Sequence, residues 1–99
     1  MHSEPADFSP YLIHNGVLRE AGAEVVSLGD GALARGQGAF ETIAAYHGRP
    51  FLAAAHLGRL RRAADVLDLD CPPDLALLAA METLLTANEL GSVAPARVR

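Results

Sequence analysis

Two short apolar runs near the N-terminus of the chain flank a turn signal, and apolar residues recur at helical spacing farther along the chain. Residues 11–14 and 17–19 are short β-prone runs on either side of Asn15 and Gly16, two residue types that tolerate the positive φ of a two-residue hairpin turn. The pattern therefore predicts a β-hairpin. The polar residues 1–10, interrupted by Pro5 and Pro10, are expected to form a flexible lead-in.

A second β-prone run covers residues 40–46 and follows a loop in which glycines stand on both sides of Gln37. We expect the chain to reverse at residues 47–50 and to continue the sheet through Phe51 and Leu52. Residues 25–27 predict a further short strand, and one helical turn is expected to begin at Asp30.

Residues 53–67 and 73–90 repeat apolar side chains at helical spacing and predict two helices, with Gly91 as a cap for the second. Residues 96–99 then alternate small or apolar with basic side chains, as at the beginning of a strand. Strands thus precede helices, which favours an α+β fold with a small antiparallel or mixed sheet and two helices packed on one face. The inward-facing residues are expected to be Leu57, Leu60, Ala64 and Leu67 in the first helix and Leu77, Leu78, Met81, Leu84 and Leu85 in the second.

Length and charge narrow the possible functions. Ninety-nine residues suffice for one domain, and a formal net charge of −4 argues against a nucleic-acid partner, because such domains concentrate positive charge. No apolar run approaches the length of a membrane span, so we expect no membrane partner. The single cysteine, Cys71, cannot form an internal disulfide, and with no signal peptide visible the cytoplasm is the expected location.

The glycines of residues 29–38 have to be weighed as a nucleotide loop. Gly31 and Gly36 have the spacing of a phosphate-binding P-loop, but Gln37 and Gly38 stand where that loop needs lysine and then serine or threonine. A dinucleotide fingerprint fails as well, because its glycine spacing differs and a strand is expected to follow here. The sequence therefore does not support a nucleotide site.

Two motifs in combination suggest a family. The chain reads Gly-Gln-Gly-Ala-Phe-Glu-Thr at residues 36–42 and His-Leu-Gly-Arg-Leu at residues 56–60. With these it resembles the class IV aminotransferases, fold-type IV enzymes that use pyridoxal 5'-phosphate, whose first domain carries G-D-G-x-F-E-T before a strand and H-x-x-R-L after it. The resemblance runs from about Leu12 to Arg99. It implies that residues 11–99 are the N-terminal domain of a homodimeric enzyme acting on an amino acid or keto acid.

Within this family, the resemblance leaves several activities open. Members include branched-chain aminotransferases, D-amino acid aminotransferases and aminodeoxychorismate lyase. Branched-chain enzymes often have an arginine where this chain has Ala44, which makes that activity less favoured. Gln37 and Gly31 also replace a usual aspartate and arginine of the family pattern. The choice among the remaining substrates, and between transferase and lyase, stays open.

Four residues are candidates for binding cofactor or substrate. The resemblance implies that Arg59 binds the cofactor phosphate, a role suited to a forked guanidinium; from the residues alone it would be read as a surface arginine, or one paired with Asp30. Arg35 is expected either to meet a substrate carboxylate or to face solvent, and Phe40 is expected either to line the substrate side or to pack in the core. Relatives place a carboxylate-binding arginine near Arg97 and Arg99, and counting along the strand favours Arg99.

Two neighbouring residues are expected to have structural roles. His56 is expected to orient the first helix, and Glu41, in an apolar run, needs a partner or solvent because burying an unpaired carboxylate is costly. Arg61 and Arg62 are expected to be ordinary surface residues.

All 8 basic residues are arginines, and the absence of lysine limits what the chain can do alone. A Schiff base to pyridoxal phosphate requires a lysine amine. We therefore expect the catalytic lysine on a second, C-terminal domain outside this sequence, and no activity from the 99 residues alone. The alternative is a stand-alone α+β binding or assembly module without cofactor, and the coding frame beyond Arg99 distinguishes the two.

Overall fold

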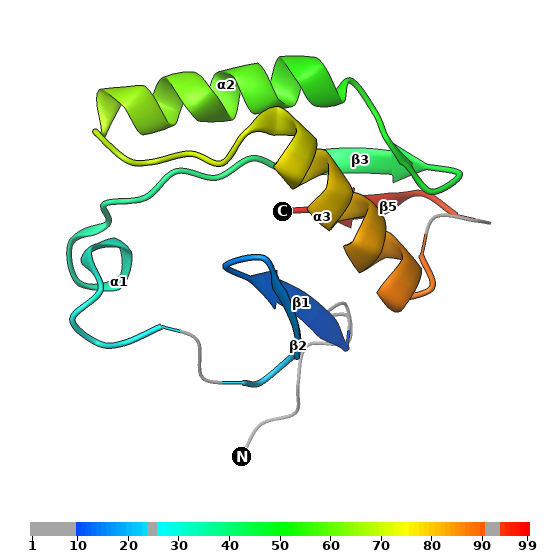
Figure 1. Ribbon diagram of the computed structural model, residues 1–99, viewed down its shortest axis with the longest axis horizontal. Helices are drawn as coiled ribbons and strands as arrows, with labels where there is room; N and C mark the ends of the chain where they lie inside the picture. The colour runs from blue at the N-terminus through cyan, green and yellow to red at the C-terminus, as the bar shows by residue number, and fades with distance from the viewer. Residues whose placement is uncertain (1–9, 24–25, 91–93) are drawn as a thin grey trace.

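The computed structural model describes residues 10–23, 26–90 and 94–99, and within them it has two small antiparallel sheets and three helices (Figure 1). The α+β class is confirmed. In chain order the elements are β1 (Tyr11–His14), β2 (Val17–Glu20), α1 (Gly31–Arg35), β3 (Ile43–Tyr46), β4 (Arg49–Pro50), α2 (Ala53–Val66), α3 (Asp74–Ala87) and β5 (Ala96–Val98).

The N-terminal hairpin is confirmed. β1 and β2 pair antiparallel, with Tyr11 opposite Glu20 and His14 opposite Val17. Asn15 and Gly16 form the turn at φ of 50° and 79°, the positive values that this residue pair permits. The hairpin is a sheet of its own and packs against α3 rather than joining the central strands.

The central sheet has the order β4-β3-β5, with every pairing antiparallel. Ile43 lies opposite Val98, so the predicted strand at residues 96–99 is confirmed. The predicted strand at residues 40–46 begins late, at Ile43. Continuing the register sets Thr42 beside Arg99, and Phe40 and Glu41 are not in a strand.

Two further strand predictions are wrong. Phe51 and Leu52 form a turn: the amide of Phe51 still donates to the carbonyl of Ala44 at 2.7 Å, but Leu52 is left-handed, with φ of 52°, and is the N-cap that precedes α2. Val26 and Ser27 are not in a strand, and Val25 lies outside the described residues. The helical turn expected at Asp30 is confirmed as α1, whose first turn the Asp30 carboxylate caps by accepting from the amide of Ala32 at 2.8 Å.

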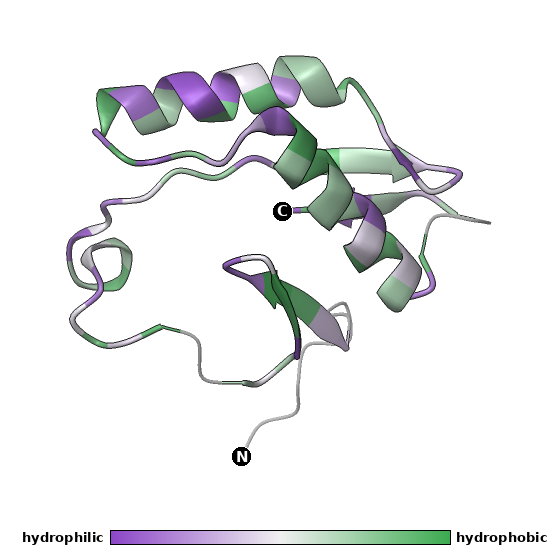
Figure 2. Cartoon of the chain, viewed as in Figure 1, coloured by the Kyte–Doolittle hydropathy of each residue, from purple (hydrophilic) through white to green (hydrophobic). Residues whose placement is uncertain are grey.

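Helices α2 and α3 cover one face of the central sheet, as predicted. The core consists of Ile43, Ala45 and Val98 from the sheet with Leu57, Met81 and Leu85 from the helices. Figure 2 shows the green, apolar stretches of α2 and α3 interrupted by purple, hydrophilic ones, as expected for helices buried along one side. Partly buried side chains complete the packing: Leu60, Leu77, Leu78, Leu84 and Ala96. Leu67 does not join them, because it ends α2 and stays 43% exposed.

The junction between the two helices involves one of the supposed surface arginines. Arg61 donates to the carbonyl oxygen of Pro72 at 2.9 Å and forms an ion pair with Asp74, the first residue of α3. The hydrogen bond to Asp74 raises the pKa of Arg61 above its ordinary value. Arg61 is at the surface, as predicted, but it also connects α2 to the beginning of α3.

Helix α3 ends at Ala87 with Asn88 as its C-cap, earlier than the predicted end at residue 90, and the predicted cap Gly91 lies outside the described residues. Across the part of the chain that the structure describes, no helix combines the length and apolar character that a membrane crossing requires.

Candidate cofactor and substrate site

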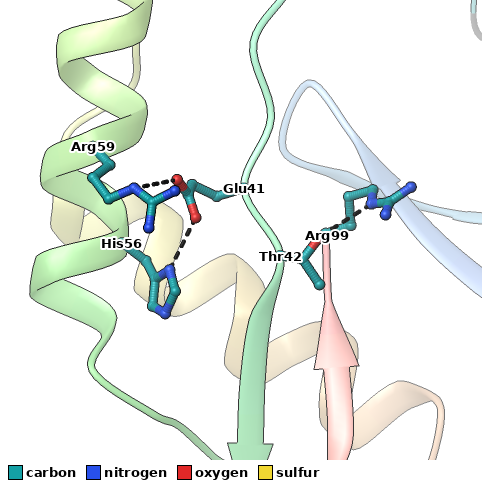
Figure 3. Close-up of polar contacts among 5 residues, drawn as sticks. All are labelled: Glu41, Thr42, His56, Arg59 and Arg99. Atoms are coloured by element: carbon teal, nitrogen blue, oxygen red, sulfur yellow. Dashed lines mark hydrogen bonds and ion pairs between the residues drawn. The ribbon is translucent and has the colours of Figure 1, made fainter.

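Glu41 is the centre of a polar cluster between the chain entering β3 and helix α2 (Figure 3). One carboxylate oxygen, Oε2, lies 2.9 Å from His56 Nδ1, and the other, Oε1, lies 3.2 Å from Arg59 Nε. The Glu41 side chain is only 12% exposed. The two contacts give this half-buried carboxylate the partners that its sequence position requires.

The contact to Glu41 determines which nitrogen of His56 carries a proton. An ionised carboxylate only accepts hydrogen bonds, so His56 Nδ1 must be the donor at 2.9 Å. Because His56 and Arg59 are three residues apart on α2, they project from the same side of the helix and reach the same carboxylate. The structure thus agrees with an orienting role for His56.

The Arg59 guanidinium is paired through Nε and exposed to solvent at its terminal nitrogens. Its Nε is paired with Glu41, while the side chain as a whole is 65% exposed. A guanidinium has five N–H donors, and using Nε leaves the four hydrogens of the two terminal nitrogens. These form the planar fork that binds phosphate or carboxylate in two-pronged fashion. The pairing with Asp30 considered from the sequence is not what the structure shows.

A second cluster gathers Arg99 with Phe40 and Thr42. Arg99 Nε donates to Thr42 Oγ1 at 3.2 Å (Figure 3), and its guanidinium carbon lies 5.1 Å from the centre of the Phe40 ring, a cation–π contact. Phe40 is 72% exposed, so it is not a core residue. Arg97 lies two residues before Arg99 along the chain, opposite Ala44, and is exposed.

Phe40 and Glu41 therefore point in different directions, although neither lies in a regular strand. Glu41 faces α2, and Phe40 faces Arg99. The short segment from Phe40 to Thr42 contacts two of the candidate arginines, Arg59 and Arg99.

A cavity of about 570 Å³ adjoins this segment. Its walls are mostly apolar and come from the hairpin, α2, α3 and β5; Phe40, Glu41 and Arg99 contribute to them, whereas Arg59 and Arg35 do not. The open edge of Arg59 is thus separate from this cavity, which belongs to the gap between the hairpin and the helices.

Arg35 is not brought to either cluster. It is the last residue of α1, and its Nε donates to Gln37 Oε1 at 3.2 Å. Gly36 ends this helix in the left-handed conformation, with φ of 67°, and Gly38 passes so near Ala32 that an added Cβ would lie 3.3 Å from the Ala32 Cβ. The glycines on either side of Gln37 therefore fold the loop back onto α1, which lies apart from α2 and α3 in Figure 1.

Comparison with known proteins identifies the family. Residues 38–99, more than half of the chain, match the family model described as Amino-transferase class IV. The chain belongs to the class IV aminotransferases. This region includes Glu41, His56, Arg59 and Arg99.

A solved structure supports the assignment over more of the fold. The chain resembles the fold IV-transaminase CpuTA1 from Curtobacterium pusillum with a TM-score of 0.66 and 36% sequence identity over 82% of its own length. It spans only 29% of the length of that transaminase. Comparison with curated protein sequences gives no match.

Sequence reasoning missed the pairing of Glu41 with both helix residues and the contact of Thr42 with Arg99. A usable signal existed for the first: His56 and Arg59, two donors three residues apart on one helix, lie near an apolar run with a single acid, Glu41. No comparable signal marked Thr42, because that contact depends on the register of β3 with β5.

Proposed function

We propose that this chain is the N-terminal domain of a pyridoxal-phosphate-dependent aminotransferase or 4-amino-4-deoxychorismate lyase, and that a second domain outside this sequence carries the catalytic lysine. Membership in the class IV aminotransferases supports an aminotransferase-type function of the whole protein. The observation that carries the proposal is Arg59, which is anchored through Nε and has its terminal fork exposed. A phosphate dianion is the ligand that such a fork suits best.

The side chains present fit the phosphate end of this cofactor. Arg59 would hold the phosphate, and the pyridine ring, when bound, supplies an electron sink for chemistry at the substrate amine carbon. The residues of this chain would bind and orient; no lysine is available in it for covalent attachment or proton transfer. This domain would therefore bind the cofactor phosphate and form part of the wall of the substrate site.

The substrate would be an amino acid or keto acid. Thr42 engages Nε of Arg99 and Phe40 lies against its guanidinium, while no described residue hydrogen-bonds the terminal nitrogens; this arrangement suits a substrate carboxylate next to an apolar group. Arg35 and the loop after α1 would cover the substrate side once a second domain closes over it.

A homodimer in the cytoplasm completes the proposal. Tyr46, Phe51 and Leu52 are exposed at one end of the central sheet, and the rings of Tyr46 and Phe51 meet edge to face at 5.6 Å. Exposed apolar side chains grouped in this way suit burial against another subunit or domain.

The test begins with the coding frame beyond Arg99 and with the full-length protein purified from it. We expect a second domain with a lysine, a yellow protein whose colour is removed by dialysis against a carbonyl-trapping amine, and amino-group transfer or conversion of 4-amino-4-deoxychorismate. The 99-residue chain alone should bind pyridoxal phosphate weakly and show no turnover. A stop codon after Arg99, or a colourless full-length protein that binds no pyridoxal phosphate, would instead favour a cofactor-free module.

A further inference from the structure

We infer that Glu41 is a positioning residue, which fixes the direction of the Arg59 guanidinium so that its two terminal nitrogens meet the cofactor phosphate. This inference rests on the proposed function, because it needs Arg59 to bind that phosphate. Glu41 itself would not touch the cofactor.

The position of the Glu41 carboxylate is restricted by two attachments. Its backbone lies two residues before Ile43, which is buried and paired with Val98 in the sheet. Its second carboxylate oxygen is occupied by His56 Nδ1 at 2.9 Å, so the carboxylate is held from the helix as well as from the strand. Two fixed attachments leave the carboxylate little freedom to follow Arg59.

Arg59, by contrast, has a long side chain that is 65% exposed and is free to change rotamer without an anchor. The contact of its Nε with Glu41 at 3.2 Å restricts it before any ligand binds. Immobilising such a side chain at the moment of binding costs affinity, and holding it in advance avoids most of that cost.

Charge alone would argue against a carboxylate here. Glu41 offsets part of the positive charge of Arg59, and a second anion in the neighbourhood repels a phosphate. The two effects of Glu41 on cofactor affinity thus have opposite signs: orientation strengthens binding and charge weakens it. Substitutions that remove them separately can therefore tell them apart.

Glu41→Gln and Glu41→Ala provide this separation. Glutamine keeps one oxygen that accepts from Arg59 Nε, and its amide can donate to His56 Nδ1 if the imidazole carries its proton on Nε2 instead. It therefore preserves the orientation and removes the charge. Alanine removes both.

The experiment measures the affinity of the full-length apo-protein for pyridoxal phosphate and for pyridoxal, which lacks the phosphate. We expect Glu41→Ala to bind pyridoxal phosphate about two- to tenfold more weakly, the cost of ordering one flexible side chain. Glu41→Gln should bind it as tightly as the parent or more tightly. Pyridoxal should bind the parent, Glu41→Ala and Glu41→Gln equally. General damage to the fold would instead weaken the binding of pyridoxal and pyridoxal phosphate alike. Glu82→Ala, on the exposed surface of α3, is the matched control and should match the parent for both ligands.

The other outcomes overturn the inference in distinguishable ways. If Arg59→Ala abolishes the preference for pyridoxal phosphate over pyridoxal but Glu41→Ala keeps it, Arg59 binds the phosphate without help and only the role of Glu41 is wrong. If Glu41→Ala and Glu41→Gln both bind pyridoxal phosphate more tightly, Glu41 acts by charge and not by orientation. If Arg59→Ala leaves the preference unchanged, the phosphate role of Arg59 fails, and the inference about Glu41 fails with it.

Discussion

The side chain of Asn88 hydrogen-bonds both the backbone amide and the backbone carbonyl of Tyr11, which lies 77 residues away in the sequence. Its side-chain oxygen accepts from the amide of Tyr11 at 2.9 Å, and its Nδ2 donates to the Tyr11 carbonyl at 3.1 Å and to the Leu84 carbonyl at 3.0 Å. The Asn88 side chain, at the C-cap of α3, thus attaches the first residue of the hairpin to the helix. The hairpin has no strand pairing with the central sheet.

Asn88→Ala should loosen this attachment. Losing two partly solvated hydrogen bonds to Tyr11 is expected to lower the free energy of unfolding by about 1 kcal/mol, which for a domain of this size corresponds to roughly 4–8 °C in Tm. Thermal unfolding of the 99-residue chain measures the loss, and faster hydrogen exchange at the Tyr11 amide locates it. Thr83→Ala, exposed on α3, is the control. An unchanged exchange rate at Tyr11 would show that Asn88 does not hold the hairpin.

Arg59→Ala in the full-length protein should reduce affinity for pyridoxal phosphate about ten- to a hundredfold, the value of a charge-assisted two-pronged contact. Arg59→Lys should recover part of it, because an ammonium keeps the charge but loses the fork. Arg62→Ala, an exposed position on the same helix, should stay within about twofold of the parent. Titration of the apo-protein compares the variants, and equal affinities for Arg59→Ala and Arg62→Ala would refute the phosphate role.

Local signals account for the elements that were predicted correctly. Asn15 and Gly16 specify a hairpin turn by their own conformational freedom, and the spacing of Leu57 and Ala64 is visible within one helix. Neither needs knowledge of a distant partner. The same holds for Asp30, whose carboxylate caps a helix that begins one residue later.

The errors occur where the outcome depends on a partner far away in the sequence. Phe40 and Glu41 have the composition of a strand, yet in the structure β5 pairs with residues 43–45 and the two residues stay outside the sheet. Arg61 looks like its neighbour Arg62 in sequence, and only the path of the chain through Pro72 and Asp74 gives it a connecting role. The same dependence explains why the partners of Glu41 in the candidate site were not foreseen.

The link between Arg61 and Asp74 leads to a prediction about pH. Because the folded-state pKa of Arg61 is raised, its contribution to stability is complete below the ordinary arginine pKa and is lost only as the pH rises through the higher folded value. Arg61→Ala, compared in a Cys71→Ser background so that no neighbouring thiol titrates, should therefore lower Tm by the same amount at any pH between about 6 and 10, a range in which arginine does not titrate. Unfolding scans of both proteins across this range provide the measurement. A difference in Tm that shrinks steadily toward pH 10 would contradict the assignment, and Arg62→Ala serves as the comparison without such a link.

The last prediction separates Arg99 from Arg97, which alternate along one strand and were both candidates for the substrate carboxylate. Arg99 has Nε engaged by Thr42 and its face against Phe40, so its terminal nitrogens are held in one place, whereas Arg97 lies opposite Ala44. If Arg99 binds the carboxylate, Arg99→Ala in the full-length protein should raise KM for an amino acid about tenfold or more and change kcat less, since an orienting contact made equally in the ground and transition states is removed. Arg97→Ala should stay within about twofold.

An amine substrate without a carboxylate tests the reason for the effect: its kcat/KM should be the same in the parent and in Arg99→Ala, because the missing guanidinium has nothing to bind. If the amine loses as much as the amino acid, Arg99 shapes the site generally, and if only Arg97→Ala raises KM, the carboxylate contact belongs to the other arginine of the strand.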